Sequence, residues 1–224
     1  MTMLSKRKIK CFVCQKESEQ DIVLSTSSVG YADLDFRFPP LKRYTIEFDI
    51  QRCPNCFYCS QNISKGIDEV KQIITTEKYK TIIISDLDEK VASFLASAEI
   101  YTQLGKTALA AIDIVYCTWI YDDRGDVESA KLCRILASNY IKSAIKNGKQ
   151  VGTEEGQSEQ LLIDVLRRAG MFKDALEQLE QFRRKKIISS ENRATFHKIM
   201  DYEENLIQKK DVDGHTIGEA LNIN

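Results

Sequence analysis

Two pairs of cysteines constrain this chain more than any other feature of its sequence. Cys11 and Cys14 are separated by two residues, and so are Cys53 and Cys56. This spacing lets both sulfurs of a tight turn reach one metal ion, and two such turns together complete a tetrahedral shell of four thiolates. A zinc ion in that shell has no open position for water or substrate, so it organises a fold and does not catalyse. The spacing therefore predicts one structural Zn²⁺ bound by Cys11, Cys14, Cys53 and Cys56.

Paired cysteines have two other common uses. A redox dithiol usually lies where a strand of an α/β unit meets a helix, and no such unit surrounds the first pair. Disulfide frameworks belong to secreted chains, whereas residues 1–10 are basic and lack the apolar region of a signal peptide. No apolar run reaches the roughly 20 residues that would span a membrane. We therefore expect a soluble, cytoplasmic protein.

The charges of the chain nearly cancel. Its 224 residues include 32 basic and 33 acidic ones, so no overall attraction to nucleic acid or anionic lipid is expected. Basic residues nevertheless gather before the first cysteine pair and between the pairs: Lys6, Arg7, Lys8, Lys10, Arg37, Lys42, Arg43 and Arg52. Basic residues around a zinc module can bind phosphates, so nucleic-acid binding is an alternative to a simply solvated face.

The segment between the cysteine pairs has an alternating pattern. Apolar Tyr44, Ile46, Phe48 and Ile50 alternate with polar residues. This period of two predicts a strand that runs into the second pair, with residues 22–25 as a candidate partner. Pro39 and Pro40 interrupt regular structure before it, and residues 25–35 are predicted to form a loop or flap. Residues 1–62 are thus predicted to form a small zinc-ribbon-like β module.

From residue 63 onward the pattern becomes helical. Apolar residues recur at intervals of three and four in the segments 91–101, 109–119, 127–140, 161–169, 172–179 and 196–206. Residues 79–85 are ambiguous, because Thr81 to Ile84 have strand propensity within a helical neighbourhood. The fold class predicted for the whole chain is α+β, mostly α, with a helical domain over residues 63–224.

Three turns of this helical region share one offset. Each has a glycine followed five residues later by an alanine: Gly105 and Ala110, Gly125 and Ala130, Gly170 and Ala175. Small residues at these positions allow close helix packing, and the pattern is similar to tetratricopeptide (TPR) helix pairs, although the turns are unevenly spaced. TPR-like antiparallel hairpins usually present a surface to a protein or peptide partner, whereas a plain packed helical domain would use the same residues only as core.

The chain also resembles a known family. The resemblance rests on Lys10-Cys-Phe-Val-Cys, Ser28-Val-Gly-Tyr-Ala-Asp-Leu-Asp-Phe-Arg, Pro40-Leu-Lys-Arg, Arg52-Cys-Pro-Asn-Cys-Phe-Tyr, Ser93-Phe-Leu, Trp119-Ile-Tyr-Asp-Asp and Lys210-Asp-Val-Asp-Gly-His. Together these segments resemble the uncharacterised bacterial domain of unknown function 2225 family. The resemblance implies a zinc-binding module followed by TPR-like helices and brings no established activity. The family's second cysteine pair usually continues Cys-Gly-Tyr, whereas Phe57 replaces that glycine here and Cys59 is additional.

Several further residues invite a functional interpretation. Cys59 has three: a replacement ligand, a reactive thiol of a redox sensor beside the metal, or a small apolar core residue. Cys117 and Cys133 lie on apolar helical stripes and are expected in the core. His215 could reach the metal if the C-terminal tail docks there, and His197 is expected on the surface.

The sequence contains no constellation typical of catalysis. Asp122 and Asp123 are adjacent, so their side chains diverge, and we expect them to cap the helix that begins near Asp126. There is no phosphate-binding glycine loop, no HExxH motif and no nucleophile elbow. We therefore expect a non-catalytic interaction or scaffold protein with one structural zinc ion. A nucleic-acid-binding or regulatory protein and a thiol redox sensor are the alternatives.

Overall fold

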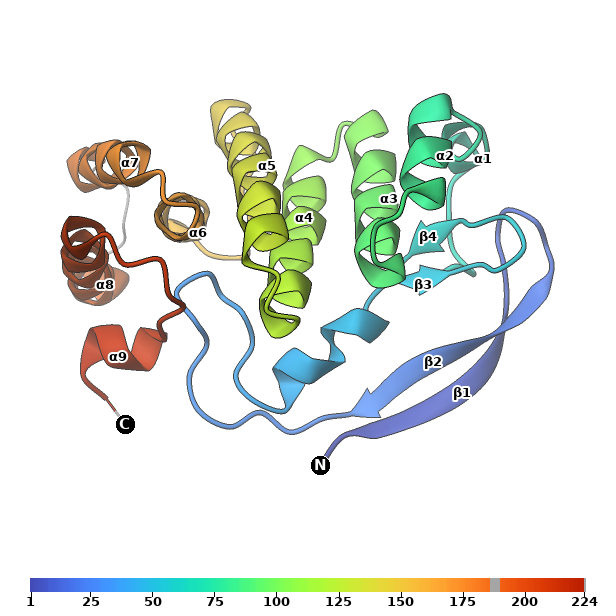
Figure 1. Cartoon of the computed structure of the whole chain (residues 1–224), viewed down its shortest axis with the longest axis horizontal. Coiled ribbons are helices and arrows are strands. Elements are labelled where there is room, and N and C mark those ends of the chain that lie inside the picture. The colour runs from blue at the N-terminus through green and yellow to red at the C-terminus, as the bar shows by residue number, and fades with distance from the viewer. Residues whose placement is uncertain (186–189, 224) are drawn as a thin grey trace.

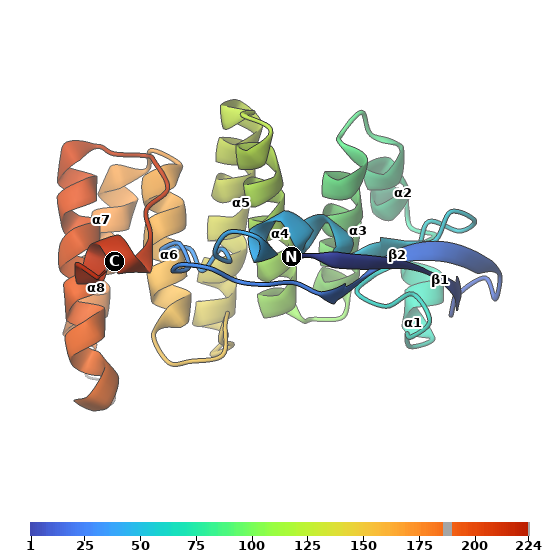
Figure 2. The same cartoon turned by 90° about the horizontal axis from the view of Figure 1, so that it is seen from below.

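The computed structural model describes residues 1–185 and 190–223. Helices stand in a row that begins beside two short β-hairpins and ends at the C-terminal tail (Figure 1). This architecture confirms the predicted class, α+β and mostly α. Seen from below, the N-terminal part of the chain runs along the row of helices from the hairpins to α6 (Figure 2).

Each cysteine pair lies at the tip of a hairpin. The pair Cys11 and Cys14 connects β1 (Met3–Lys10) with β2 (Glu17–Ser25), and these strands are antiparallel. The pair Cys53 and Cys56 connects β3 (Gln51–Arg52) with β4 (Cys59–Ser60), also antiparallel. The two hairpins form separate two-stranded sheets.

The strand predicted over residues 44–50 is wrong. Residues Lys42–Phe48 form a 3₁₀ helix, and Ile22 to Ser25 pair with β1 instead of with this segment. Tyr44 is 63% exposed whereas the adjacent Thr45 and Ile46 are both buried, a pattern that a strand with one buried face cannot produce. Tertiary contacts override the alternating pattern here, since burial of two consecutive side chains suits a helical turn.

The helical predictions are largely confirmed. The helices are α1 (Glu69–Ile73), α2 (Glu77–Ile84), α3 (Glu89–Gln103), α4 (Thr107–Asp123), α5 (Val127–Lys146), α6 (Gln157–Arg168), α7 (Phe172–Arg184), α8 (Ser190–Lys209) and α9 (Ile217–Leu221). From α2 to α8, each helix packs against the next along the chain. The ambiguous segment 79–85 lies in α2, where Tyr79 is buried against the second hairpin.

The glycine and alanine turns behave as the sequence predicts. Gly105, Gly125 and Gly170 all have φ near +70°, a conformation that glycine adopts without steric cost. The alanines that follow them are fully buried: Ala110, Ala130 and Ala175. A fully buried alanine therefore lies near the start of α4, of α5 and of α7, and each of these helices packs against the helix before it.

The segment 26–41 connects β2 with the 3₁₀ helix and contains no helix or strand of its own. Leu34 is fully buried, its N–H donates to the carbonyl of His215, and its own carbonyl accepts from the Gln160 side chain. The N–H of Ile217 donates to the carbonyl of Ala32. Residues 32–34 therefore contact both α6 and the C-terminal tail. These contacts connect the two predicted domains, residues 1–62 and 63–224, and the boundary between the domains stays a prediction.

Asp113 is a buried carboxyl in α4 with an unsatisfied oxygen. Its Oδ2 has no hydrogen-bond partner among the described residues, and the side chain is nearly inaccessible. Burial raises the pKa of Asp113 from 3.8 to about 7, the Ser97 hydroxyl opposes this rise, and the charge of Asp49 adds to it.

The Asp113→Asn variant should therefore be more stable than the wild type at high pH. The pKa of Asp113 is higher in the folded state than in the unfolded state. The wild-type protein therefore has its full stability below about pH 4, where the carboxyl is protonated in both states, and loses stability as the pH rises through 7. We expect a gain of about 1–3 kcal/mol in the free energy of unfolding at pH 8, vanishing near pH 4, in urea titrations at both pH values. Asp86→Asn, at an exposed position, is the control. An equal effect of Asp113→Asn at both pH values would contradict the prediction.

Among the described residues, no helix combines the length and apolar character needed to cross a membrane.

Candidate metal centre

The four predicted metal ligands converge on one point. The sulfur atoms of Cys11, Cys14, Cys53 and Cys56 all lie within 4.8 Å of one another. Cys11 Sγ lies 3.7 Å from Cys56 Sγ, and Cys14 Sγ lies 3.6 Å from Cys53 Sγ. A tetrahedron with metal–sulfur bonds of about 2.3 Å has edges of about 3.8 Å. The sulfurs are therefore already spaced as ligands of one tetrahedral metal ion.

Both cysteine turns have the same backbone design. The first cysteine of each pair accepts a hydrogen bond from the N–H four residues later, from Gln15 to Cys11 and from Phe57 to Cys53. Its own N–H donates to the carbonyl five residues later, Lys16 in one turn and Tyr58 in the other. This repeated geometry points both sulfurs of each turn to the same side, which is what a shared ion requires.

Each turn places a non-glycine residue at positive φ. Gln15 has φ 61° and Phe57 has φ 60°, a conformation that costs a side-chain-bearing residue roughly 1–2 kcal/mol. Phe57 occupies the position where the related family usually has glycine, yet the turn keeps its hydrogen bonds. The half-exposed Phe57 ring lies under the guanidinium of Arg52, 5.0 Å from its centroid. The turn at Phe57 therefore combines backbone strain with the same hydrogen-bond pattern as the turn at Gln15.

Burial and neighbouring groups shift the pKa of three of the thiols, Cys11, Cys53 and Cys56. Burial raises the pKa of Cys11, and burial together with the neighbouring thiols raises that of Cys56 further. At Cys53 burial acts in the same direction, but hydrogen bonds from backbone N–H groups and from the Cys14 and Cys56 thiols lower the pKa to about 7. Four adjacent thiols can all become thiolates only around a cation. The donor set therefore fits a thiophilic divalent metal ion.

Helix α2 supports the second cysteine turn from behind. The hydroxyl of Tyr79 donates to the carbonyl of Phe57 at 2.8 Å and accepts from the N–H of Cys59 at 3.1 Å. Cys59 itself lies outside the sulfur cluster, is buried, and donates its Sγ–H to the Phe57 carbonyl. Burial raises the pKa of Cys59 to about 11. These contacts support its interpretation as an apolar core residue and not as a reactive thiol.

The remaining candidates lie away from the cluster. His215 contacts Tyr202 and Asp211, with its Nδ1 3.2 Å from the tyrosine hydroxyl, so the tail docks against α8 and not at the metal site. His197 is exposed, as expected. Cys117 is fully buried, and Cys133 is half-buried and packs against the hydrophobic core, so both lie where the sequence predicts.

A buried ionic network is a feature that the sequence does not reveal. Asp35 accepts hydrogen bonds from Trp119 Nε1 at 2.7 Å and from Arg168 at 2.8 Å. Arg168 also binds Asp122 at 2.8 Å, and Asp122 in turn accepts from Arg134. Three segments on which the family resemblance rests contribute to or adjoin this network: 28–37, 119–123 and 210–215.

The capping role predicted for Asp122 and Asp123 is wrong. Asp126 caps α5, because its side chain accepts a hydrogen bond from the N–H of Ser129. Asp122 is held by the two arginines of the network, and Asp123 pairs with Arg37 at 2.5 Å. The two aspartates do diverge, as expected, and each neutralises a guanidinium from another part of the chain.

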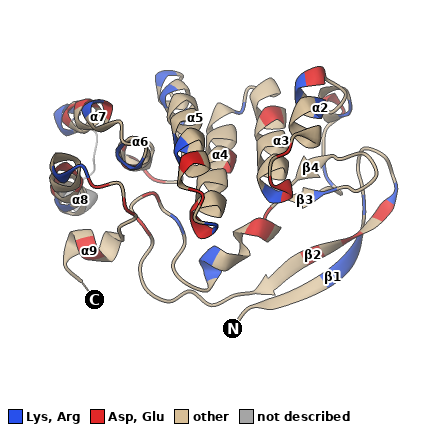
Figure 3. Ribbon diagram, in the orientation of Figure 1, with Lys and Arg blue, Asp and Glu red and all other residues tan. Residues whose placement is uncertain are grey.

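Several basic residues of the N-terminal region lie beside acidic or aromatic residues of the same chain. Across the β1–β2 ribbon, Lys6 lies opposite Asp21, Lys8 opposite Glu19, and Lys10 opposite Glu17. Arg43 binds Asp33 at 2.8 Å, and Lys42 lies 3.7 Å from the centroid of the Phe38 ring. Figure 3 shows the basic residues interleaved with acidic ones on the ribbon and along the row of helices. Acidic residues therefore lie close to these basic ones along the chain.

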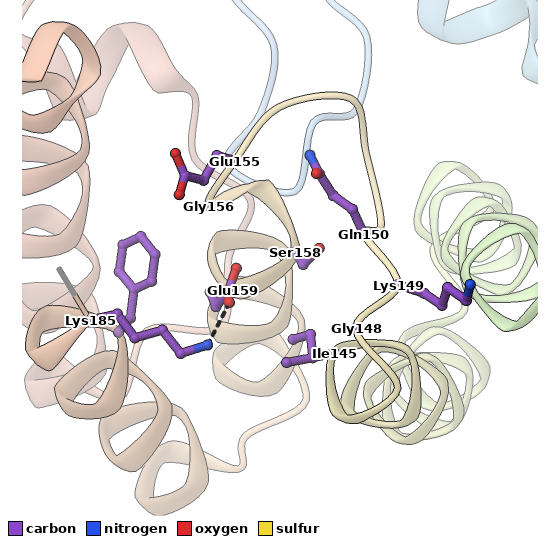
Figure 4. Close-up of a pocket in the computed structure, with 10 residues that line it drawn as sticks. Ile145, Gly148, Lys149, Gln150, Glu155, Gly156, Ser158, Glu159 and Lys185 are labelled. Carbon is purple, nitrogen blue, oxygen red and sulfur yellow. Dashed lines mark hydrogen bonds and ion pairs between the residues drawn. The ribbon is translucent and has the colours of Figure 1, made fainter. Parts of the chain in front are cut away.

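At least three hollows lie on the helical part, and one of about 340 Å³ is lined by Asp122, Arg134 and Arg168 of the ionic network. An apolar cleft of about 320 Å³ is bounded by the segment 35–38, α4 and α6, and is lined by Phe36, Phe38, Val115, Tyr116, Trp119 and Leu161. A third hollow, of about 200 Å³, lies between the 148–156 loop, α6 and α7 (Figure 4). Within it Lys185 pairs with Glu159 at 2.8 Å, and the Ser158 hydroxyl is bonded to the backbone of Val151. Three of its polar side chains, Lys185, Glu159 and Ser158, therefore make contacts within the chain.

Comparison with known proteins yields one match. A family model described as an uncharacterized protein conserved in bacteria (DUF2225) covers residues 4–208. No curated protein and no solved structure matches the chain. The match agrees with the resemblance carried by the sequence motifs.

Proposed function

The chain belongs to the DUF2225 family of uncharacterised bacterial proteins, and from this premise we propose that it is a zinc-stabilised, non-catalytic interaction protein. In this proposal one Zn²⁺ bound by the four cysteines fixes the two hairpins against the helices. The TPR-like row of helices then offers a surface to a protein or peptide partner. The observation that carries the proposal is the closed set of four sulfurs within 4.8 Å of one another.

Zinc is the metal that this donor set favours. Thiolates are soft ligands, and a tetrahedral set of four of them is typical of zinc or of iron–sulfur centres. The two tight turns match the structural zinc sites of small β modules, where bound metal contributes folding free energy directly. A fourfold thiolate shell leaves no ligand position for a substrate, which supports a structural role.

The apolar cleft supports a partner site on the helices. Its volume of about 320 Å³ suits one or two apolar side chains of a bound peptide. Trp119 and Tyr116 stack along one wall, with ring centroids 4.6 Å apart. Phe36 forms part of the rim and has φ 65°, a strained conformation that the surrounding contacts hold in place. Aromatic residues of this kind are enriched where proteins bind one another.

Site-specific cross-linking tests this partner site. We expect p-benzoylphenylalanine at Phe38, in the cleft, to capture a defined protein in irradiated bacterial cells, and Leu161→Arg to abolish that product. The same probe at Leu132, which is exposed on α5 outside the cleft, is the matched control. If both probes gave the same products, or if Leu161→Arg left the product unchanged in a folded protein, the cleft would not be the partner site.

A further inference from the structure

The β1–β2 ribbon leaves one strand edge uncovered. Among the described residues β1 pairs with β2 alone, and the sheet contains no third strand. On the far side of β2 the 3₁₀ helix packs against that strand, and Gln20 donates to the carbonyl of Arg52 at 3.2 Å. In Figure 1, β1 forms the outer side of the ribbon, away from the helices. Its outer edge therefore presents unpaired backbone N–H and C=O groups.

The charges on the ribbon define what this edge can accept. Lys6, Lys8 and Lys10 are exposed and share one face of β1, because alternate residues of a strand point the same way. On the inner side they lie opposite Asp21, Glu19 and Glu17 of β2, all exposed as well. The chain thus already shows β1 pairing with a strand that carries an acidic residue at every second position. On the outer side the same lysines face no strand among the described residues.

We propose that the outer edge of β1 binds an extended acidic segment of a partner protein as a third strand. Main-chain hydrogen bonds would supply affinity, and acidic side chains at alternate positions, opposite the three lysines, would supply specificity. Beyond the lysines, Leu4 is 47% exposed and lies opposite Val23 of β2. The partner segment therefore carries an apolar residue after its acidic ones, as β2 does.

The same features disfavour a second copy of this chain as the occupant. Pairing two β1 edges would bring rows of lysine together, and like charges on adjacent strands are destabilising. The acidic strand β2 of another copy is less accessible, because it contacts the 3₁₀ helix and its Gln20 side chain donates to the carbonyl of Arg52. An isolated two-stranded hairpin is only marginally stable in water, so a third strand from another protein would also complete the sheet.

This surface is independent of the apolar cleft on the helices. It requires only that the ribbon is folded, which the metal centre at its tip favours. Variants that test it therefore leave all four cysteines in place, so its failure is distinguishable from failure of the cleft or of the metal site.

The probe is a synthetic peptide with the sequence of β2, residues 17–25. Its affinity for the full-length protein is measured by isothermal titration calorimetry, and hydrogen exchange reports which strand it touches. A second peptide of the same sequence, N-methylated at alternate residues, keeps the charges but cannot form a ladder of main-chain hydrogen bonds. Lys6→Gln/Lys8→Gln/Lys10→Gln is the test protein, and Lys80→Gln/Lys173→Gln/Lys198→Gln removes three exposed helical lysines as the control.

We expect the peptide to bind and to slow amide exchange in β1 while β2 stays protected. The triple variant of β1 should bind about tenfold more weakly, the control variant should bind equally well, and N-methylation should weaken binding at least tenfold. Equal binding of the N-methylated peptide would reduce the interaction to charge attraction and overturn the proposal. Loss of β2 protection, which indicates strand exchange, or no binding at millimolar peptide would overturn it as well.

Discussion

Replacing Cys14 with serine should abolish metal binding and unfold the two hairpins while leaving most of the helices intact. In comparable cysteine modules, metal binding contributes about 10–16 kcal/mol of apparent free energy to folding near pH 7. Here that free energy would stabilise two strands of only two residues each and an exposed ribbon. Without the ion, the two-residue strands β3 and β4 keep only their contacts with α2 and α3, and β1 and β2 lose the tie at their tip. Hydrogen exchange should show β1 to β4 fully exchanged, whereas α4 to α7 remain protected.

Cys133→Ser is the matched control, because Cys133 is a half-buried cysteine outside the sulfur cluster. It should retain the metal and protected hairpins. The account of the N-terminal module would be contradicted if Cys14→Ser kept both its metal and its hairpin protection, or if the two variants behaved alike.

Replacing Arg167 with methionine should destabilise the C-terminal part by about 3–5 kcal/mol, the usual effect of breaking a buried ion pair. Arg167 is fully buried and binds Asp164 at 2.5 Å and Glu203 at 2.9 Å. It also donates to the carbonyls of Asp211 and Asp213, so it fastens the tail to α6. Its loss would leave two carboxyl groups buried without a cation.

The readout is urea denaturation combined with hydrogen exchange at Leu34 and Ile217, whose N–H groups bond across the tail. Exchange at both should accelerate in Arg167→Met. In Arg183→Met, which breaks only exposed ion pairs with Asp201 and Glu204, the loss should stay below about 1 kcal/mol. The double variant Arg167→Met/Asp164→Leu, which removes opposite charges together, should recover part of the loss. Equal effects of the two arginine variants would contradict the role given to Arg167.

Local features of the fold follow from the sequence. The glycine turns and buried alanines are set by short-range chemistry, since a positive φ and a close helix contact each need a particular small residue. The cysteine spacing likewise predicts the cluster of four sulfurs, because each turn is only a few residues long.

Long-range contacts account for what the sequence does not show. The strand expected over residues 44–50 is a 3₁₀ helix because burial of Thr45 and Ile46 against the rest of the fold outweighs the alternation. Asp35 and Arg168 are 133 residues apart in the chain, and no local pattern connects them. The pairing of β1 with β2 could have been predicted from the sequence. Lysines occupy every second position before the first cysteine pair, and acidic residues occupy every second position after it.

The most direct test of the account is the metal content of the purified, untagged protein by elemental analysis, with thiols counted in parallel. We predict one zinc per chain, with Cys11, Cys14, Cys53 and Cys56 unreactive toward a thiol reagent until a chelator removes the metal. A protein without zinc whose four cysteines react freely while both hairpins stay folded would contradict the structural zinc site on which the proposed function rests.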